Sequence, residues 1–171
     1  MRHIIAILLQ NEAGALARVA GMFSSRGYNI DSLSVAPTHD PAVSRLTLVT
    51  SGSDAVIHQI LQQTRKVVDV VEIIDLSARD HLELELVLVK VAATDEQARR
   101  LIDCARRHHA VMLDETDTTR TVQSTGTVAE NDAFLAELAD VAPIIELVRS
   151  GVAALERGPA ALTAPEDDST P

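Results

Sequence analysis

The sequence predicts an α+β protein built from two tandem ferredoxin-like domains, each with the element order βαββαβ. Apolar residues recur at a strand-like period of two in some segments and at a helix-like period near 3.6 in others. These segments follow one another in the same order twice, with a repeat length of about 80 residues. The fold class therefore rests on periodicity and on an internal repeat.

The first domain is expected to span residues 1–77. Gly27 is placed to end the first helix as a C-cap, and Gly52-Ser53-Asp54 is a cap signal for the second. The expected strands are 2–9, 28–36, 43–50 and 67–76, and the expected helices are 15–26 and 54–66. This order gives an antiparallel sheet with both helices on one face, so the other face is left to solvent or to a partner.

The second domain is expected to span residues 83–158, after a polar linker at 78–82. Thr94, followed by Glu96 and Gln97, is a typical helix start. The expected strands are 82–92, 110–115, 119–125 and 143–149, and the expected helices are 94–107 and 128–139. Residues 159–171 are acidic, contain prolines and lack apolar periodicity, so we expect a disordered acidic tail.

Composition and charge exclude several classes of protein. The net charge of −10 and the 2% content of aromatic residues disfavour nucleic-acid binding, which needs basic surfaces and stacking rings. Cys104 is the single cysteine, so no intramolecular disulfide can form. The apolar run at the N-terminus is too short for a signal peptide, and no run reaches the roughly 20 residues that span a bilayer. We expect a cytoplasmic protein.

No catalytic or metal site is expected. None of the six histidines stands at a recognised zinc-ligand spacing from a cysteine or another histidine. Cys104 lies among apolar residues of an expected helix, which is typical of a buried, inert thiol. Asp114, Glu115 and Asp117 crowd a turn that could hold a divalent cation, although a solvated acidic turn is the simpler interpretation. We therefore expect that the chain is not an enzyme by itself.

The turn between the first strand and the first helix is the best candidate binding site. Gly14 lets the backbone approach a ligand, and the amides of Gly14, Ala15 and Leu16 can donate to a carboxylate at the positive end of the helix dipole. Asn11 can add its side chain, and the carbonyl oxygen of Asn29 can accept from an ammonium group. The alternative is a tight turn with a helix cap and no ligand.

The stretch NEAGALARVAGMFSSRGYNIDSLSVAPTHDPAVSRLTLV resembles the ACT domain of the small regulatory subunit of acetolactate synthase, also called acetohydroxyacid synthase. The resemblance combines an N-x-x-G-x-L-x-R-V helix start, F-S-x-R-G-Y-N-I, a V-A-P-T loop and an S-R-L-T strand. The second half adds DAFL and I-x-E-L-V-R-S-G, so the resemblance covers residues 1–158. His108 and Arg120 stand where the family pattern is more apolar.

The resemblance implies a non-catalytic subunit that activates a large subunit and confers feedback inhibition by valine in branched-chain amino-acid biosynthesis. Thiamine diphosphate, Mg²⁺ and FAD are then expected in the large subunit, and no cofactor is expected in this one. The family's ACT domains pair as a homodimer or higher oligomer and bind valine between two chains. The matching site residues are Asn11, Gly14, Ala15 and Leu16 of one chain with Asn29 and Ile30 of its neighbour.

Three other functions remain open from the sequence. The chain could be an amino-acid-sensing ACT protein that regulates a different enzyme. It could also be a small enzyme with a ferredoxin-like fold, or an RNA-binding protein of the same topology. The acidic charge and the missing aromatic residues argue against RNA.

Overall fold

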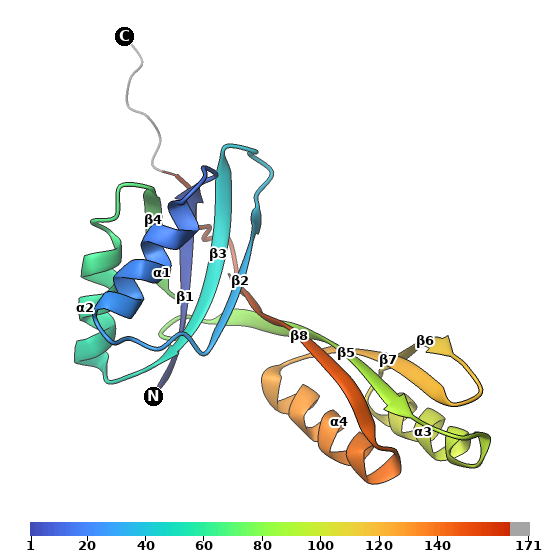
Figure 1. Ribbon diagram of the computed structural model, residues 1–171. Helices are drawn as coiled ribbons and strands as arrows, with labels where there is room; N and C mark the ends of the chain where they lie inside the picture. The colour runs from blue at the N-terminus through green and yellow to red at the C-terminus, as the bar shows by residue number, and fades with distance from the viewer. Residues whose placement is uncertain (165–171) are drawn as a thin grey trace. The chain divides into compact units, whose positions relative to one another are not determined.

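A computed structural model describes residues 1–164 and confirms the predicted fold class. The described chain forms two compact units, one comprising Met1–Leu82 together with Ala153–Ala164, and the other comprising Glu83–Val152. Each unit contains a four-stranded sheet with two helices, so the βαββαβ order occurs twice (Figure 1). Among the described residues, no helix has the length and apolar character needed to cross a membrane.

The first unit has the strand order β2-β3-β1-β4. Its strands are β1 (Arg2–Gln10), β2 (Ser32–Pro37), β3 (Val43–Ser51) and β4 (Val70–Asp75), and its helices are α1 (Ala15–Ser25) and α2 (Asp54–Thr64). Both helices lie on one face of the sheet (Figure 1). Alternate residues of β1, including Ile5, Ile7 and Leu9, are buried in a core with Val19 and Phe23 of α1.

The opposite face of this sheet is also buried at Ile4, Ala6 and Leu8. A sequence expectation left that face to solvent or to a partner. In the first unit, the segment after Ala153 runs over it instead, and Leu162 lines the same cavity as Leu8. Both faces of β1 are therefore covered, which explains why its apolar residues form a continuous run.

The second unit repeats the arrangement with the strand order β6-β7-β5-β8. Its strands are β5 (His81–Ala92), β6 (Val111–Glu115), β7 (Thr119–Gly126) and β8 (Ile144–Glu156), and its helices are α3 (Asp95–Arg107) and α4 (Val128–Val141). Val87, Val89 and Val91 of β5 pack with Leu101 of α3 and Phe134 of α4 to form its core. Valine and leucine thus build a core that contains little aromatic volume.

Three expected strand bounds differ from the observed ones by three residues or more, and β4 is one of them, because it begins at Val70 rather than at residue 67. Strand β2 begins at Ser32 rather than at residue 28, because Tyr28 turns back onto Phe23, with its N–H 3.0 Å from the Phe23 carbonyl oxygen. Strand β8 continues to Glu156, beyond the expected end at residue 149, through Gly151 at a φ of 74°.

The two units also divide the chain differently from the expected domains. The second domain is expected to run from 83 to 158, whereas the second compact unit is Glu83–Val152 and Ala153–Ala164 lies with the first unit. Part of the expected tail, residues 159–164, lies within the described chain and has no helix or strand, and the rest lies outside the described residues.

Candidate effector site

Helix α1 begins without a side-chain cap. Its N-cap is Gly14, which adopts a left-handed φ of 91°, and its first turn carries no acidic residue. The Ala15 N–H donates to the Glu12 carbonyl oxygen at 3.2 Å, but the N–H groups of Leu16 and Ala17 have no hydrogen-bond acceptor within residues 1–164. These free donors lie at the positive end of the helix dipole, where an anion is stabilised.

The side chain of Asn11 is hydrogen-bonded to the loop between β2 and β3 and to the start of β3. Its Nδ2 donates to the Pro41 carbonyl oxygen at 2.9 Å, and its Oδ1 accepts from Ser44 Oγ at 3.0 Å. Its backbone N–H donates to the Ala42 carbonyl oxygen at 2.7 Å. Because an amide nitrogen carries two hydrogens, Asn11 retains one N–H that could serve a ligand. Asn11 thus positions the loop and offers at most one further donor.

A cavity of about 260 Å³ lies beside this helix start. Three of the expected site residues line it, namely Asn11, Ala15 and Leu16. Val35 of β2 lines it too, and both Leu16 (37% exposed) and Val35 (41% exposed) leave apolar surface uncovered. The remaining lining residues are Leu9, Gln10, Glu12, Ala36, Pro37 and Ser44. Backbone donors next to aliphatic side chains suit a small apolar molecule that carries a carboxylate.

The other expected residues lie at the opposite end of α1. Asn29 and Ile30 follow the far end of α1, a helix of 11 residues that is about 16 Å long at 1.5 Å per residue, whereas Gly14 precedes its start. Asn29 Nδ2 donates to Asp31 Oδ1 at 2.6 Å, and Ile30 packs against the core of the first unit. A single chain therefore does not bring Asn29 and Ile30 to the same small ligand as Gly14.

Two charged residues near the site were missed by sequence reasoning. A Cβ atom placed on Gly14 would lie 2.8 Å from Arg18 Nη1, so the guanidinium lies against the helix start. Asp69, which is buried, holds Arg18 through Nε–Oδ2 at 2.5 Å and Nη2–Oδ1 at 2.6 Å, and this hydrogen bonding lowers the pKa of Asp69. The sequence does contain a signal for Arg18, because it is a basic residue in the first turn of a helix, where the helix dipole disfavours positive charge unless an anion is present.

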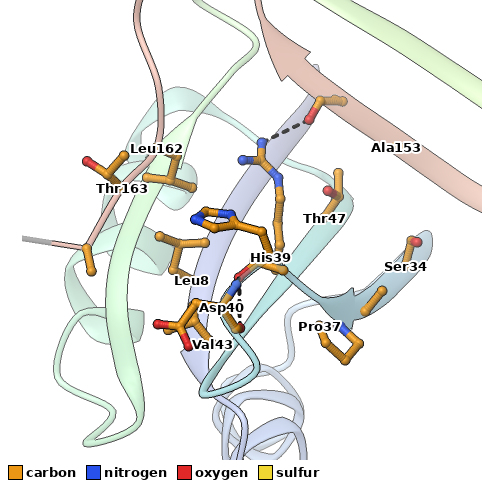
Figure 2. Close-up of a pocket in the computed structure, with 15 residues that line it drawn as sticks. Leu8, Ser34, Pro37, His39, Asp40, Val43, Thr47, Ala153, Leu162 and Thr163 are labelled. Carbon is orange, nitrogen blue, oxygen red and sulfur yellow. Dashed lines mark hydrogen bonds between the residues drawn. The ribbon is translucent and has the colours of Figure 1, made fainter.

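A larger cavity of about 550 Å³ lies on the other face of the first sheet (Figure 2). Leu8, Val43 and Leu162 supply apolar surface, and Arg45 crosses the cavity to donate from Nη2 to the Ala154 carbonyl oxygen at 2.9 Å. Burial lowers the pKa of the Arg45 guanidinium. The cavity shares Ala36 and Pro37 with the smaller one but lacks every expected site residue.

The other sequence candidates show structural roles. Cys104 is buried, as predicted. Glu115 of the acidic turn pairs with Arg120 at 2.9 Å, and Arg120, itself buried, also pairs with Asp95 at 3.2 Å. These ion pairs explain how an arginine fits where the family pattern is more apolar. Within residues 1–164, Asp114, Glu115 and Asp117 do not bring three donor atoms together.

Comparison with known proteins assigns both halves to one family. Residues 5–72 match the model of the AHAS small subunit-like ACT domain, and residues 84–158 match that of the small subunit of acetolactate synthase. The chain is 48% identical to the acetolactate synthase isozyme 3 small subunit of Salmonella typhimurium over 92% of this chain and 97% of that protein. The acetolactate synthase isozyme 3 small subunit of Escherichia coli is 47% identical, again over 92% of this chain and 97% of that protein.

A solved structure agrees with these sequence matches. The acetolactate synthase small subunit of Thermotoga maritima superposes with a TM-score of 0.85 at 28% identity, covering 94% of this chain and 99% of that one. The likeness thus extends over both βαββαβ units. The chain belongs to the family of acetolactate synthase small subunits, regulatory partners of the catalytic subunit.

Proposed function

We propose that this chain activates the catalytic large subunit of acetolactate synthase and makes it sensitive to feedback inhibition by valine. The observation that carries the proposal is the open start of α1 at Gly14, beside a cavity lined by Leu16 and Val35. The free amides would receive the carboxylate of valine, and the aliphatic side chains would receive its isopropyl group.

The site is completed by a second copy of the chain. Gly14 precedes α1 and Asn29 follows it, and the helix between them is about 16 Å long, so a single chain offers the carboxylate contact and the ammonium contact in separate places. Asn29 and Ile30 of a neighbouring copy would face Gly14 of this one. Strand β2, at the edge of its sheet, carries the exposed Val35 and is suited to such an interface.

Asp31 strengthens the case for an ammonium contact at the Asn29 end. It accepts from Asn29 Nδ2 at 2.6 Å and from Ser51 Oγ at 2.7 Å, which fixes the Asn29 amide with its nitrogen toward Asp31. The Asn29 Oδ1 atom then faces away from that bond and can accept from an ammonium group, while the Asp31 carboxylate adds favourable charge.

Inhibition would arise because valine binds one arrangement of the paired chains more tightly than another. A difference of about 1–3 kcal/mol between the two arrangements is typical of such coupling. Thiamine diphosphate, Mg²⁺ and FAD would be held by the large subunit, which would carry out the condensation of 2-ketoacids. This chain would contribute no catalytic residue.

The test is reconstitution with the large subunit from the same organism. We expect no acetolactate from this chain alone, a higher rate when it is added to the large subunit, and a lower rate when valine is then added. Leucine and isoleucine, assayed in parallel, define the effector preference. A large subunit whose rate is unchanged by the chain, with or without valine, would overturn the proposal.

The alternative is an ACT protein that senses an amino acid for a different enzyme. Affinity capture from the native cell distinguishes the two functions. Recovery of a thiamine-dependent large subunit supports the proposal, whereas reproducible recovery of another enzyme without it supports the alternative.

A further inference from the structure

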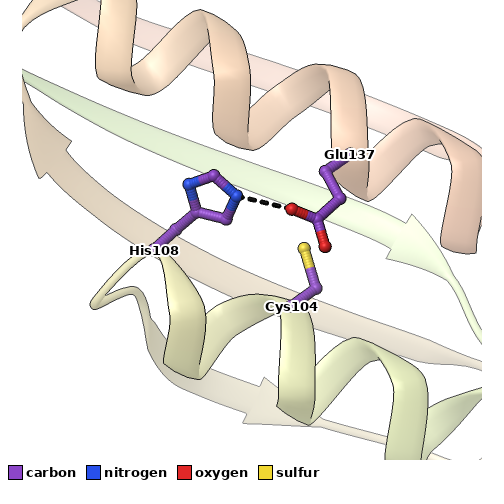
Figure 3. A group of neighbouring side chains, drawn as sticks. All are labelled: Cys104, His108 and Glu137. Atoms are coloured by element: carbon purple, nitrogen blue, oxygen red, sulfur yellow. Dashed lines mark hydrogen bonds and ion pairs between the residues drawn. The ribbon is translucent and has the colours of Figure 1, made fainter.

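Three metal-ligating side chains of the second unit converge where α3 lies against α4. Cys104, His108 and Glu137 each place one donor atom so that all three atoms lie within 4.8 Å of one another. Figure 3 shows the three side chains pointing toward one another, two from α3 and its C-cap and one from α4. The cluster lies outside the candidate effector site.

The backbone determines this convergence. Cys104 and His108 are four residues apart, so they project from the same face of α3. The His108 ring packs on Phe134 with a centroid separation of 5.5 Å, and Phe134 lies one turn before Glu137 on α4. Core packing therefore fixes the His108 ring next to the Glu137 carboxylate. Zinc-ligand spacing along the sequence did not identify this cluster. Its third residue, Glu137, comes from another helix and is 29 residues from His108.

The donor distances are close to those of a coordinated ion. Zinc binds sulfur at about 2.3 Å, and histidine nitrogen and carboxylate oxygen at about 2.0–2.2 Å, so tetrahedral donors lie roughly 3.3–3.6 Å apart. His108 Nε2 lies 2.8 Å from Glu137 Oε2 and would need to move slightly outward. The other pairs, at 4.8 Å or less, would close by about 1 Å, which side-chain torsions can supply.

The charges around the cluster also suit a divalent cation. Burial raises the pKa of the Cys104 thiol, so its proton would leave only when a bound cation displaces it, and the resulting thiolate and the Glu137 carboxylate together would balance a charge of +2. Arg107 Nη2 bonds Glu137 Oε1, which leaves Oε2 for the cation and orients the carboxylate from outside. His108 and Glu137 are partly exposed, so an ion can enter from solvent although Cys104 is buried.

We propose that Cys104, His108 and Glu137 form a zinc site, with water as the fourth ligand, that ties α3 to α4. A set of one sulfur, one nitrogen and one oxygen favours zinc, whereas Mg²⁺ and Ca²⁺ prefer oxygen ligands alone. The competing interpretation is a metal-free cluster in which His108 and Arg107 simply neutralise Glu137.

Cobalt substitution of the full chain tests the proposal. The chain is stripped with a chelator, kept reduced with a phosphine, and titrated with Co²⁺ while its absorption spectrum is recorded. We expect one equivalent to produce a thiolate-to-cobalt charge-transfer band and the visible bands of a tetrahedral ion, and Zn²⁺ to bleach both. Because Cys104 is the only cysteine, such a band can come from no other residue.

Matched variants separate the site from surface binding. Cys104→Ala should abolish the charge-transfer band, and Glu137→Gln should weaken Co²⁺ binding at least about tenfold, while circular dichroism shows that both remain folded. His58→Ala, an exposed histidine of α2 in the first unit, should leave the titration unchanged. Absence of the band in the wild-type chain, or Co²⁺ bound without it, would overturn the proposal.

Discussion

The first helices of the two units, α1 and α3, occupy the same place in the repeat but begin in opposite ways. At α3, Thr94 is the N-cap, its N–H is bound by Gln97 Oε1 at 3.1 Å, and Asp95 and Glu96 put negative charge in the first turn. At α1, Gly14 offers no side chain and no acid follows it. The repeat therefore keeps one fold with two kinds of helix start, and the α1 start leaves its first backbone N–H groups without a capping side chain.

The remaining helices support this contrast. Helix α4 begins with a capping box in which Thr127 N–H donates to Glu130 Oε2 at 2.7 Å and Glu130 N–H donates to Thr127 Oγ1 at 3.3 Å. Helix α2 begins at Ser53, whose side chain accepts from Val56 N–H. Of the four helices in the described chain, α1 alone lacks a hydroxyl side chain at its start. The exception coincides with a cavity, which argues for a ligand.

A substitution that blocks the open start of α1 should have the largest effect, and that effect should be on valine affinity. Gly14→Asp would force a residue with a Cβ into a φ of 91° and place a negative charge where the carboxylate of valine is expected. We expect a loss of valine affinity of about 100-fold or more, equivalent to roughly 2.7 kcal/mol, measured by titration calorimetry. Activation of the large subunit should be largely retained. Gly14→Ala adds strain without charge, so its valine affinity should lie between those of the wild type and Gly14→Asp. Unchanged valine affinity in Gly14→Asp would contradict the assignment of this site.

The pair beside Gly14 should make stability depend on acid. The hydrogen bond from Arg18 lowers the pKa of Asp69, so the pair stabilises the folded chain above the ordinary carboxyl pKa and loses that contribution as the pH falls through the lowered value. Asp69→Asn should therefore be less stable than the wild type at pH 7, and the difference should shrink in acid.

Urea unfolding at a series of pH values measures this effect. Asp140→Asn, an exposed acid of α4, is the control and should change stability little at any pH. A stability difference between Asp69→Asn and wild type that is the same at every pH would show that the ion pair is not its source.

Opening the α3 start should affect stability and not binding. Gln97→Ala removes the acceptor for Thr94 N–H and the donor to the Val141 carbonyl oxygen at 3.1 Å, which should cost about 1–2 kcal/mol in chemical unfolding. Valine affinity should match that of the wild type, because the acidic residues in the first turn of α3 would still disfavour the binding of a carboxylate there. A change in valine affinity would mean that the second unit takes part in effector binding.

The smallest effect should come from the C-terminal segment. Truncation after Gly158 removes Leu162, which is half-buried over the sheet face opposite the helices, and should cost about 1 kcal/mol of unfolding free energy. Truncation after Ala164 keeps all residues that line the cavity and serves as the control. Equal stability of the two truncated chains would show that the segment is a passive extension, as the sequence suggested.

The fold could be predicted because local patterns agreed with the global arrangement. The alternation in β3 and the helical spacing in α1 each identified their element without tertiary information. The start of strand β2 was predicted too early, because Tyr28 and Ile30 are apolar residues that pack against the core without belonging to a strand. Local periodicity cannot separate these two causes.

The site could be predicted only in part. A glycine at a strand-to-helix junction marks a possible anion cradle, but the Arg18–Asp69 pair joins residues 51 positions apart, and such a contact has no local pattern. Cys104 and His108 are only four residues apart, but Glu137, which completes their cluster, is 29 residues from His108 and could not be associated with them by local spacing. The separation of Gly14 from Asn29 followed from helix length once the bounds of α1 were known.

The central claim is that one valine site is built from Gly14 of one chain and Asn29 of another, and a mixed assembly tests it most directly. Chains carrying Gly14→Asp and chains carrying Asn29→Ala are purified with different tags, refolded together, and the doubly tagged species is titrated with valine. In a two-fold dimer one site receives both substitutions and the other receives neither. We predict wild-type affinity at about half the wild-type stoichiometry, although each variant alone binds poorly. Failure of the mixed assembly to recover any valine binding would contradict a site shared between chains.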